Sequence, residues 1–116
     1  ARSVAKIHAL LANKGEAHGV RLFSEALAKQ VMDVRIEGTD MALAVPMSFG
    51  LGFGINTAKL LSPNPNVCFW GGWGGSLALI DQDAGMSMSY VMNKMHVGLV
   101  GDLRSFNLAQ AMYAAL

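Results

Sequence analysis

The stretch Phe69-Trp70-Gly71-Gly72-Trp73-Gly74-Gly75-Ser76 decides how the rest of this chain is organised. An apolar run beginning at Val67 leads into it, and a second run, Leu77-Ala78-Leu79-Ile80, leads out of it. This pattern predicts two strands joined by a glycine-rich turn. Glycine lets a backbone approach another group closely, and tryptophan usually stacks on a surface or lines a pocket. The stretch therefore predicts either a place where a ligand meets the main chain or a glycine-rich hairpin with two core tryptophans.

The composition leaves the chain short of charged surface. Its 116 residues suit one domain, and 53% of them are hydrophobic while only 15% are charged. The average globular domain has about 25% charged residues. We therefore expect a partner, or covalent neighbours, to cover part of the surface. The net charge is +1 with no basic run, so nucleic-acid binding has no electrostatic support.

The single cysteine, Cys68, excludes an internal disulfide framework. Because it lies in an apolar run, a buried inert thiol is favoured over a nucleophile. No apolar stretch approaches the roughly 20 residues of a membrane helix, and no signal peptide opens the chain. We therefore expect no membrane association and a cytoplasmic location. The chain does not begin with Met, and Ala1-Arg2-Ser3 reads as though it begins inside a secondary-structure element. We therefore also expect the true N-terminus to be absent.

Helical patterns dominate residues 1–45. Apolar residues at three- and four-residue spacing predict a helix over Ser3–Asn13, ended by Gly15. A turn or short hairpin built on Gly19 follows, and Ser24 is a good N-cap for a second helix. That helix is expected over 25–32. Residues 34–45 read as an irregular polar loop, and we expect it to be mobile.

Strand patterns dominate residues 46–95. Residues 48–55 alternate strictly between Gly and larger apolar side chains, which predicts one strand after Pro46. A proline-rich loop over 59–66, the opening hairpin and a strand over 86–95 follow. In the remaining segment, 96–116, Asp102 caps a final helix over 103–116. The prediction is an α+β fold, an antiparallel sheet flanked by helices and left with an uncovered edge.

Three other patterns carry no function in this interpretation. The Gly-x-Gly-x-Gly pattern that starts at Gly50 lies within the alternating run, whereas a dinucleotide loop follows a strand and opens a helix. His8 and His18 lie on different elements without a carboxylate at ligand spacing, so neither predicts a metal site. Asp81 and Asp83 read as carboxylates of a hairpin turn.

Several stretches together resemble the C-terminal segment of the beta-lactamase-like serine hydrolases. The resemblance is strongest to the family VIII carboxylesterases, which are relatives of class C beta-lactamases and penicillin-binding proteins. It covers essentially the whole chain, and only about the last third of a complete family member. The stretches that carry it are the opening stretch, Asp81, Met88-Ser89-Tyr90-Val91-Met92-Asn93-Lys94-Met95, the helix from Ala1 to Gly15, Gly19-Val20-Arg21-Leu22-Phe23-Ser24, and Phe49-Gly50-Leu51-Gly52-Phe53.

The resemblance implies a fold and a site. The fold would be the C-terminal part of the beta-lactamase/transpeptidase-like fold, incomplete in this chain. The family uses a Ser-x-x-Lys pair, a tyrosine and a third box on an edge strand. Trp70-Gly71-Gly72 matches the esterase form of that box and would contact substrate. The backbone N–H of Trp73 would be one donor of the oxyanion hole. Tryptophan in place of the beta-lactamase lysine favours neutral, short-chain carboxylic esters, and no metal or organic cofactor is implied.

The chain departs from the family because it lacks the reactive residues. Ser3-Val4-Ala5-Lys6 has the Ser-x-x-Lys spacing, but it lies on a helix that matches a different family segment. Tyr90-Val91-Met92-Asn93 has one residue too many for Tyr-x-Asn and reads as a core strand. The prediction is one wall of an esterase site, inactive alone, whose partner is the N-terminal part that carries the serine, lysine and tyrosine. The alternatives are a non-catalytic binding module that keeps the sheet, and a truncated product without function.

Overall fold

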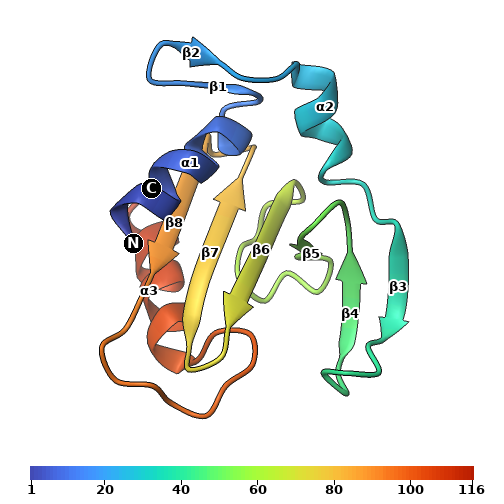
Figure 1. Ribbon diagram of the computed structural model, residues 1–116, viewed down its shortest axis with the longest axis vertical. Coiled ribbons are helices and arrows are strands. Elements are labelled where there is room, and N and C mark those ends of the chain that lie inside the picture. Colours follow the sequence, from blue (N-terminus) through green and yellow to red (C-terminus); the bar gives the residue numbers. More distant parts are fainter.

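The sheet of this protein has six strands, more than the sequence predicts. The computed structural model describes all residues from 1 to 116. The six strands are antiparallel and lie side by side in chain order (Figure 1). They are β3 (Ile36–Thr39), β4 (Pro46–Phe49), β5 (Gly54–Ile55), β6 (Val67–Gly72), β7 (Ser76–Asp81) and β8 (Met86–Tyr90). The α+β class and the antiparallel sheet flanked by helices are confirmed.

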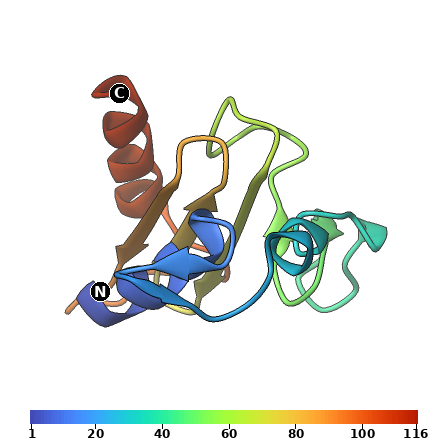
Figure 2. The same ribbon diagram turned by 90° about the horizontal axis from the view of Figure 1, so that it is seen from above.

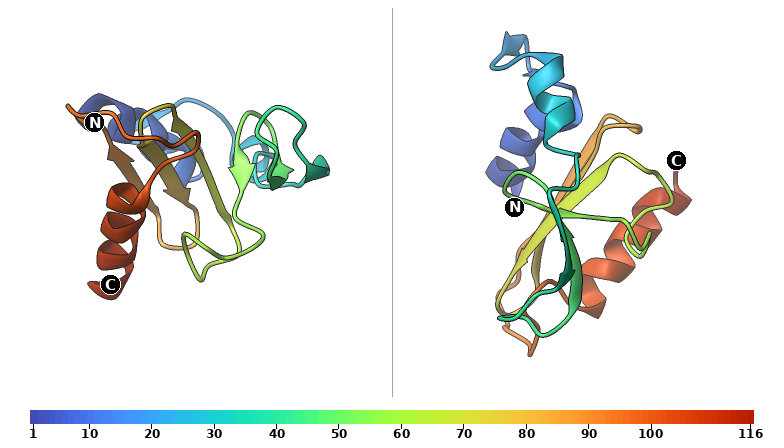
Figure 3. Two further views of the ribbon diagram at one scale, coloured as in Figure 1. Left: turned by 90° about the horizontal axis from the view of Figure 1, so that it is seen from below. Right: turned by 90° about the vertical axis from the view of Figure 1, so that its right-hand side faces the viewer.

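Helices cover both faces of the sheet. α1 (Arg2–Ala12) lies on one face against β7 and β8, and α3 (Leu103–Ala114) lies on the other against β7 (Figures 2 and 3). Along the chain, a two-stranded hairpin and the short helix α2 (Glu25–Gln30) follow α1 and precede β3. The hairpin pairs β1 (Glu16–Ala17) with β2 (Val20–Arg21).

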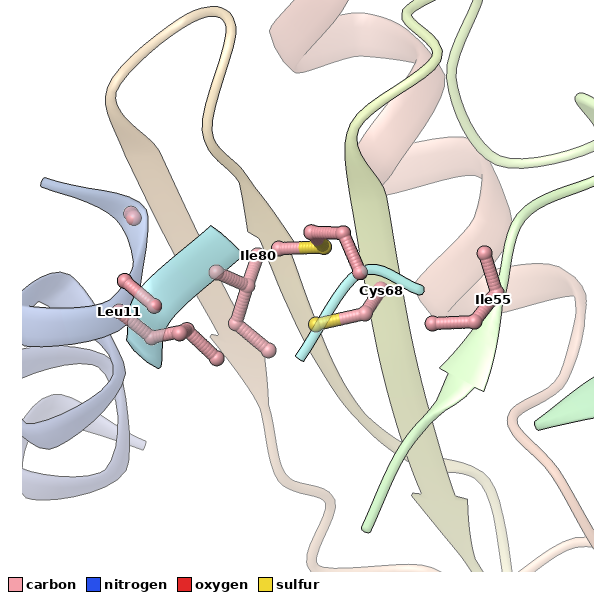
Figure 4. Close-up of a cluster of buried hydrophobic side chains, with 7 residues drawn as sticks. Leu11, Ile55, Cys68 and Ile80 are labelled. Atoms are coloured by element: carbon pink, nitrogen blue, oxygen red, sulfur yellow. The ribbon is translucent and has the colours of Figure 1, made fainter. Parts of the chain in front are cut away.

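The core is split by the sheet into two clusters. On the α1 side it contains Leu11, Ala12, Ala28, Met32, Ile55, Cys68 and Ile80, four of which are labelled in Figure 4. On the α3 side it contains Leu61, Val67, Leu77, Leu79, Met88 and Ala109. The two groups follow from the alternation of side chains along β6 and β7. Gln82 Nε2 closes the first cluster by donating to the carbonyls of Leu11 (3.2 Å) and Ala28 (2.9 Å).

Local sequence signals placed the helices correctly. α1 ends where Lys14 and Gly15 take positive φ, and the turn at Gly19 joins β1 to β2. Ser24 Oγ caps α2 by accepting from Leu27 N at 3.2 Å. Asp102 caps α3 through a capping box. The apolar stripe of α1 is only partly covered, because Leu11 is buried while Ile7 is 66% exposed.

The strand predictions were wrong where the alternation of buried and exposed side chains does not determine the strands. The predicted irregular loop 34–45 contains β3, whose four residues are all exposed and are ordered by the backbone ladder to β4. Residues 48–55 are not one strand: the chain reverses between β4 and β5, and Gly50 N donates to Phe53 O at 2.9 Å. The strand expected over 86–95 ends at Tyr90, because its partner Leu77 lies at the start of β7.

Candidate active-site edge

The lower part of β6 has no strand on one side. β5 is only two residues long, and it pairs Gly54 with Phe69 and Ile55 with Cys68 (Figure 1). Trp70 and the two glycines after it pair with β7 only. We call residues 70–73 on the side of β6 away from β7 the open edge. An open edge presents backbone N–H and C=O groups to whatever lies beside it.

The direction of the main-chain groups along this edge follows from the hydrogen-bond pattern. Val67 O accepts from Asn56 N at 3.0 Å, and Asn56 directly follows β5. Because neighbouring residues of an antiparallel strand point their N–H and C=O to opposite sides, Gly71 also faces away from β7, and Trp73 follows as the first residue of the turn after β6. The Trp73 N–H makes no hydrogen bond within the chain. A free N–H at the end of an open edge is suited to bind an oxygen that develops negative charge.

Both tryptophans are partly exposed, so the interpretation of two core tryptophans is wrong. The exposed fractions are 39% for Trp70 and 63% for Trp73. Trp70 stands beside Phe49, with ring centroids 5.7 Å apart and planes tilted by 51°. The structure therefore brings the residues of the predicted site, Trp70, Gly71, Gly72 and Trp73, to one strand end with two aromatic surfaces open to a ligand.

A loop over residues 91–101 supports the turn that follows the open edge. Gly74 N donates to Gly98 O at 3.0 Å, and His96 N donates to Gly74 O at 3.1 Å. A Cβ on Gly71 would lie 2.5 Å from Gly101 N, so the loop packs directly on the backbone of β6. Glycine at position 71 is therefore required by close packing.

Sequence reasoning missed the residue that ties this turn to α3. Arg104 Nη2 donates to Gly74 O at 3.1 Å, Nη1 donates to Lys94 O at 2.8 Å, and Nε donates to Asp102 Oδ2 at 2.9 Å. The hydrogen bond from Arg104 lowers the pKa of Asp102. The sequence identified Asp102 only as a helix cap. No local pattern marks Arg104, since its partners lie up to 30 residues away.

The other residues singled out from the sequence lie away from this site. Ser3 and Lys6 are exposed on α1, whose contacts are with β1, β7 and β8. Cys68 is fully buried as expected, and burial raises the pKa of its thiol to about 12. Tyr90 ends β8, and Val91 after it is 53% exposed, so the expected core strand through residue 93 is wrong.

Comparison with known proteins identifies the class of protein to which this fold belongs. The chain has the fold of the C-terminal part of the beta-lactamase-like serine hydrolases, and the resemblance to that segment is confirmed. The crystal structure of a family VIII carboxylesterase is 34% identical, with a TM-score of 0.91 over 97% of this chain and 31% of that one. A penicillin-binding protein homolog from Caulobacter crescentus is 36% identical, with a TM-score of 0.92 over 98% of this chain and 31% of that one.

A curated relative agrees with the two structures. The esterase/beta-lactamase LipL of Mycobacterium tuberculosis is 30% identical over an alignment 111 residues long, and the match covers 87% of this chain and 25% of the relative. The chain thus spans between a quarter and a third of the proteins it matches. No family model matches it. None of its helices has the length and apolar character needed to cross a membrane.

Proposed function

We propose that this chain is the part of a serine esterase that supplies the Trp-Gly-Gly box and one donor of the oxyanion hole. The reaction is hydrolysis of short-chain carboxylic esters through an acyl-serine intermediate. The observation that carries the proposal is the open edge of β6, where the Trp73 N–H has no partner in the chain. Removal of one such donor typically lowers the rate about 10²–10³-fold, so a single N–H matters.

The reactive residues come from outside these 116 residues. An acyl-enzyme mechanism needs a nucleophile, a base and the oxyanion donors in one site. In this chain, the only pair with the family's Ser-x-x-Lys spacing is Ser3 and Lys6, and both lie exposed on α1. The relatives are three to four times longer than the segment that they share with this chain. Their remaining part is the proposed source of the serine, lysine and tyrosine, and this chain alone is inactive.

The side chains at the open edge favour neutral esters. Trp70 occupies the position where the beta-lactamases carry a lysine, so the edge offers an aromatic wall in place of a cation that attracts a carboxylate. Phe49 extends that wall. The partly exposed surfaces of Trp70 and Trp73 contact the acyl or alkoxy group of a small substrate.

Labelling with a fluorophosphonate probe tests the proposal. The complete enzyme containing this segment is expected to be labelled on a serine outside residues 1–116 and to hydrolyse p-nitrophenyl acetate. The isolated segment is expected to show neither property. A complete protein that is folded but is neither labelled nor active contradicts the esterase and supports a binding module. Labelling of the isolated segment on Ser3, with turnover, contradicts the assignment of the nucleophile to the rest of the enzyme.

A further inference from the structure

The turn that carries the proposed oxyanion donor is not held in place by its own hairpin. Between β6 and β7, the only backbone bond within the turn runs from Gly75 N to Gly72 O, at 3.2 Å. Both Gly74 and Gly75 have positive φ, so the backbone here is intrinsically adaptable. A donor on an adaptable turn contributes to catalysis only if something else fixes its direction.

Two backbone hydrogen bonds join Gly74 to the loop over residues 91–101. Arg104 adds a side-chain connection from this turn to the start of α3. Its guanidinium reaches Gly74 O in the turn, Lys94 O in the loop and the carboxylate of Asp102. Asp102 is itself anchored, because its carboxylate accepts from Arg104 N (2.9 Å) and Ser105 N (3.4 Å) as the cap of α3. The guanidinium thus joins three separate segments through hydrogen bonds.

The carboxylate that holds Arg104 packs closely against the turn. The Asp102 side chain is only 8% exposed. A Cβ on Gly75 would lie 2.1 Å from Asp102 Oδ2, so the carboxylate rests against the main chain of the turn. The Tyr90 ring lies 5.9 Å from the Arg104 guanidinium carbon and adds a cation–π contact.

We propose that Arg104, held by Asp102, is a positioning residue that fixes the Trp73–Gly75 turn and with it the direction of the Trp73 N–H. The inference rests on the proposed function, since it assigns a role in the same oxyanion hole. Arg104 does not bind the substrate directly in this proposal, because three of its nitrogen atoms are already engaged with protein acceptors.

Steady-state kinetics of the complete enzyme with p-nitrophenyl acetate tests the inference. Arg104→Ala is expected to lower kcat about 10–100-fold while KM changes less than about twofold, because the misplaced donor acts in the transition state. Arg104→Lys keeps the charge and the fold but cannot reach three acceptors at once, so it is expected to recover only part of kcat. Arg21→Ala is the matched control, because Arg21 makes an exposed pair with Glu16 on the distant β1–β2 hairpin.

Hydrogen exchange measured by mass spectrometry gives a readout that does not depend on activity. In Arg104→Ala, amides in a peptide over residues 69–77 are expected to exchange faster, with no change in peptides from α1. Unchanged kcat, unchanged exchange, or a rise in KM with constant kcat would overturn the inference. A Trp73→Pro enzyme with normal activity would instead overturn the proposed oxyanion role, whatever the exchange data for Arg104 show.

Discussion

Gly71 of β6 lies directly against Gly101, the residue before the α3 cap, with only 2.5 Å between Gly101 N and the position that a Cβ on Gly71 would occupy. Gly71 is therefore a packing site between the sheet and the loop after β8. This contact places the loop beneath the open edge, where it can support the turn at Gly74.

Gly71→Ala is expected to destabilise the purified protein by about 1–3 kcal/mol, since a methyl group there meets backbone that must move. Gly72→Ala is the matched control, because its Cβ would meet only the Ser76 hydroxyl, which can rotate away. Urea unfolding of both variants measures the difference. Equal stabilities of the two variants would show that the loop is not tightly packed on β6.

Trp73→Pro is expected to lower kcat for p-nitrophenyl acetate by about 10²–10³ in the complete enzyme, because proline has no N–H for the oxyanion. The substitution breaks no backbone bond, since this N–H has no partner within the chain. Trp73→Ala keeps the N–H and is expected to retain most of kcat while KM rises. If both variants lose kcat equally, the indole and not the N–H is what the reaction needs.

The sequence predicted those parts of the fold that local chemistry determines. Ser24 and Asp102 marked helix starts because a capping side chain bonds to its own helix. β3 could not be predicted, because all of its residues are exposed and its order comes from a ladder to β4 alone. The alternation through residues 48–55 was misleading because a turn at Gly50 reverses the chain.

The candidate site was also predicted only in part, because local sequence patterns do not show which distant segments come together. Trp70 and Trp73 stood out because tryptophan beside glycine is unusual, and the family resemblance gave the stretch a role. Neither signal could reveal the open edge, which exists because β5 ends after two residues. Arg104 could not be identified either, since its contacts with Gly74 and Lys94 arise only when the loop folds under the turn.

Alkaline pH is expected to destabilise the protein through Cys68. Burial raises the pKa of this thiol from 9.0 to about 12, so above pH 9 the unfolded chain loses a proton that the folded chain keeps. Stability is therefore highest below pH 9 and falls as pH rises towards 12, by about 1.4 kcal/mol per pH unit. Urea unfolding at pH 7 to 10 measures the slope. In Cys68→Ala this component is expected to vanish, and parallel slopes in the two proteins would contradict it.

The carboxylate of Asp81 connects three parts of the chain on the far side of the sheet from α1. It is fully buried at the end of β7. Burial raises the pKa of Tyr113 on α3, so its phenol stays a donor to Asp81 Oδ2, at 2.7 Å. The other donors to the carboxylate are Ser62 Oγ, Asn64 Nδ2, Asp83 N and Ala84 N.

Asp81→Asn is expected to destabilise the protein by about 3 kcal/mol, because an amide nitrogen would replace an acceptor that buried donors require. The substitution keeps the size of the side chain, so the loss reports on hydrogen bonding and charge and not on a cavity. Asp33→Asn is the control, since Asp33 is exposed and makes one pair with Arg35 at 3.4 Å. That control is expected to change stability by less than about 0.5 kcal/mol. Thermal or urea unfolding of the two variants makes the comparison. A stable Asp81→Asn protein would show that Asp81 does not join the proline-rich loop and α3 to the β7–β8 turn.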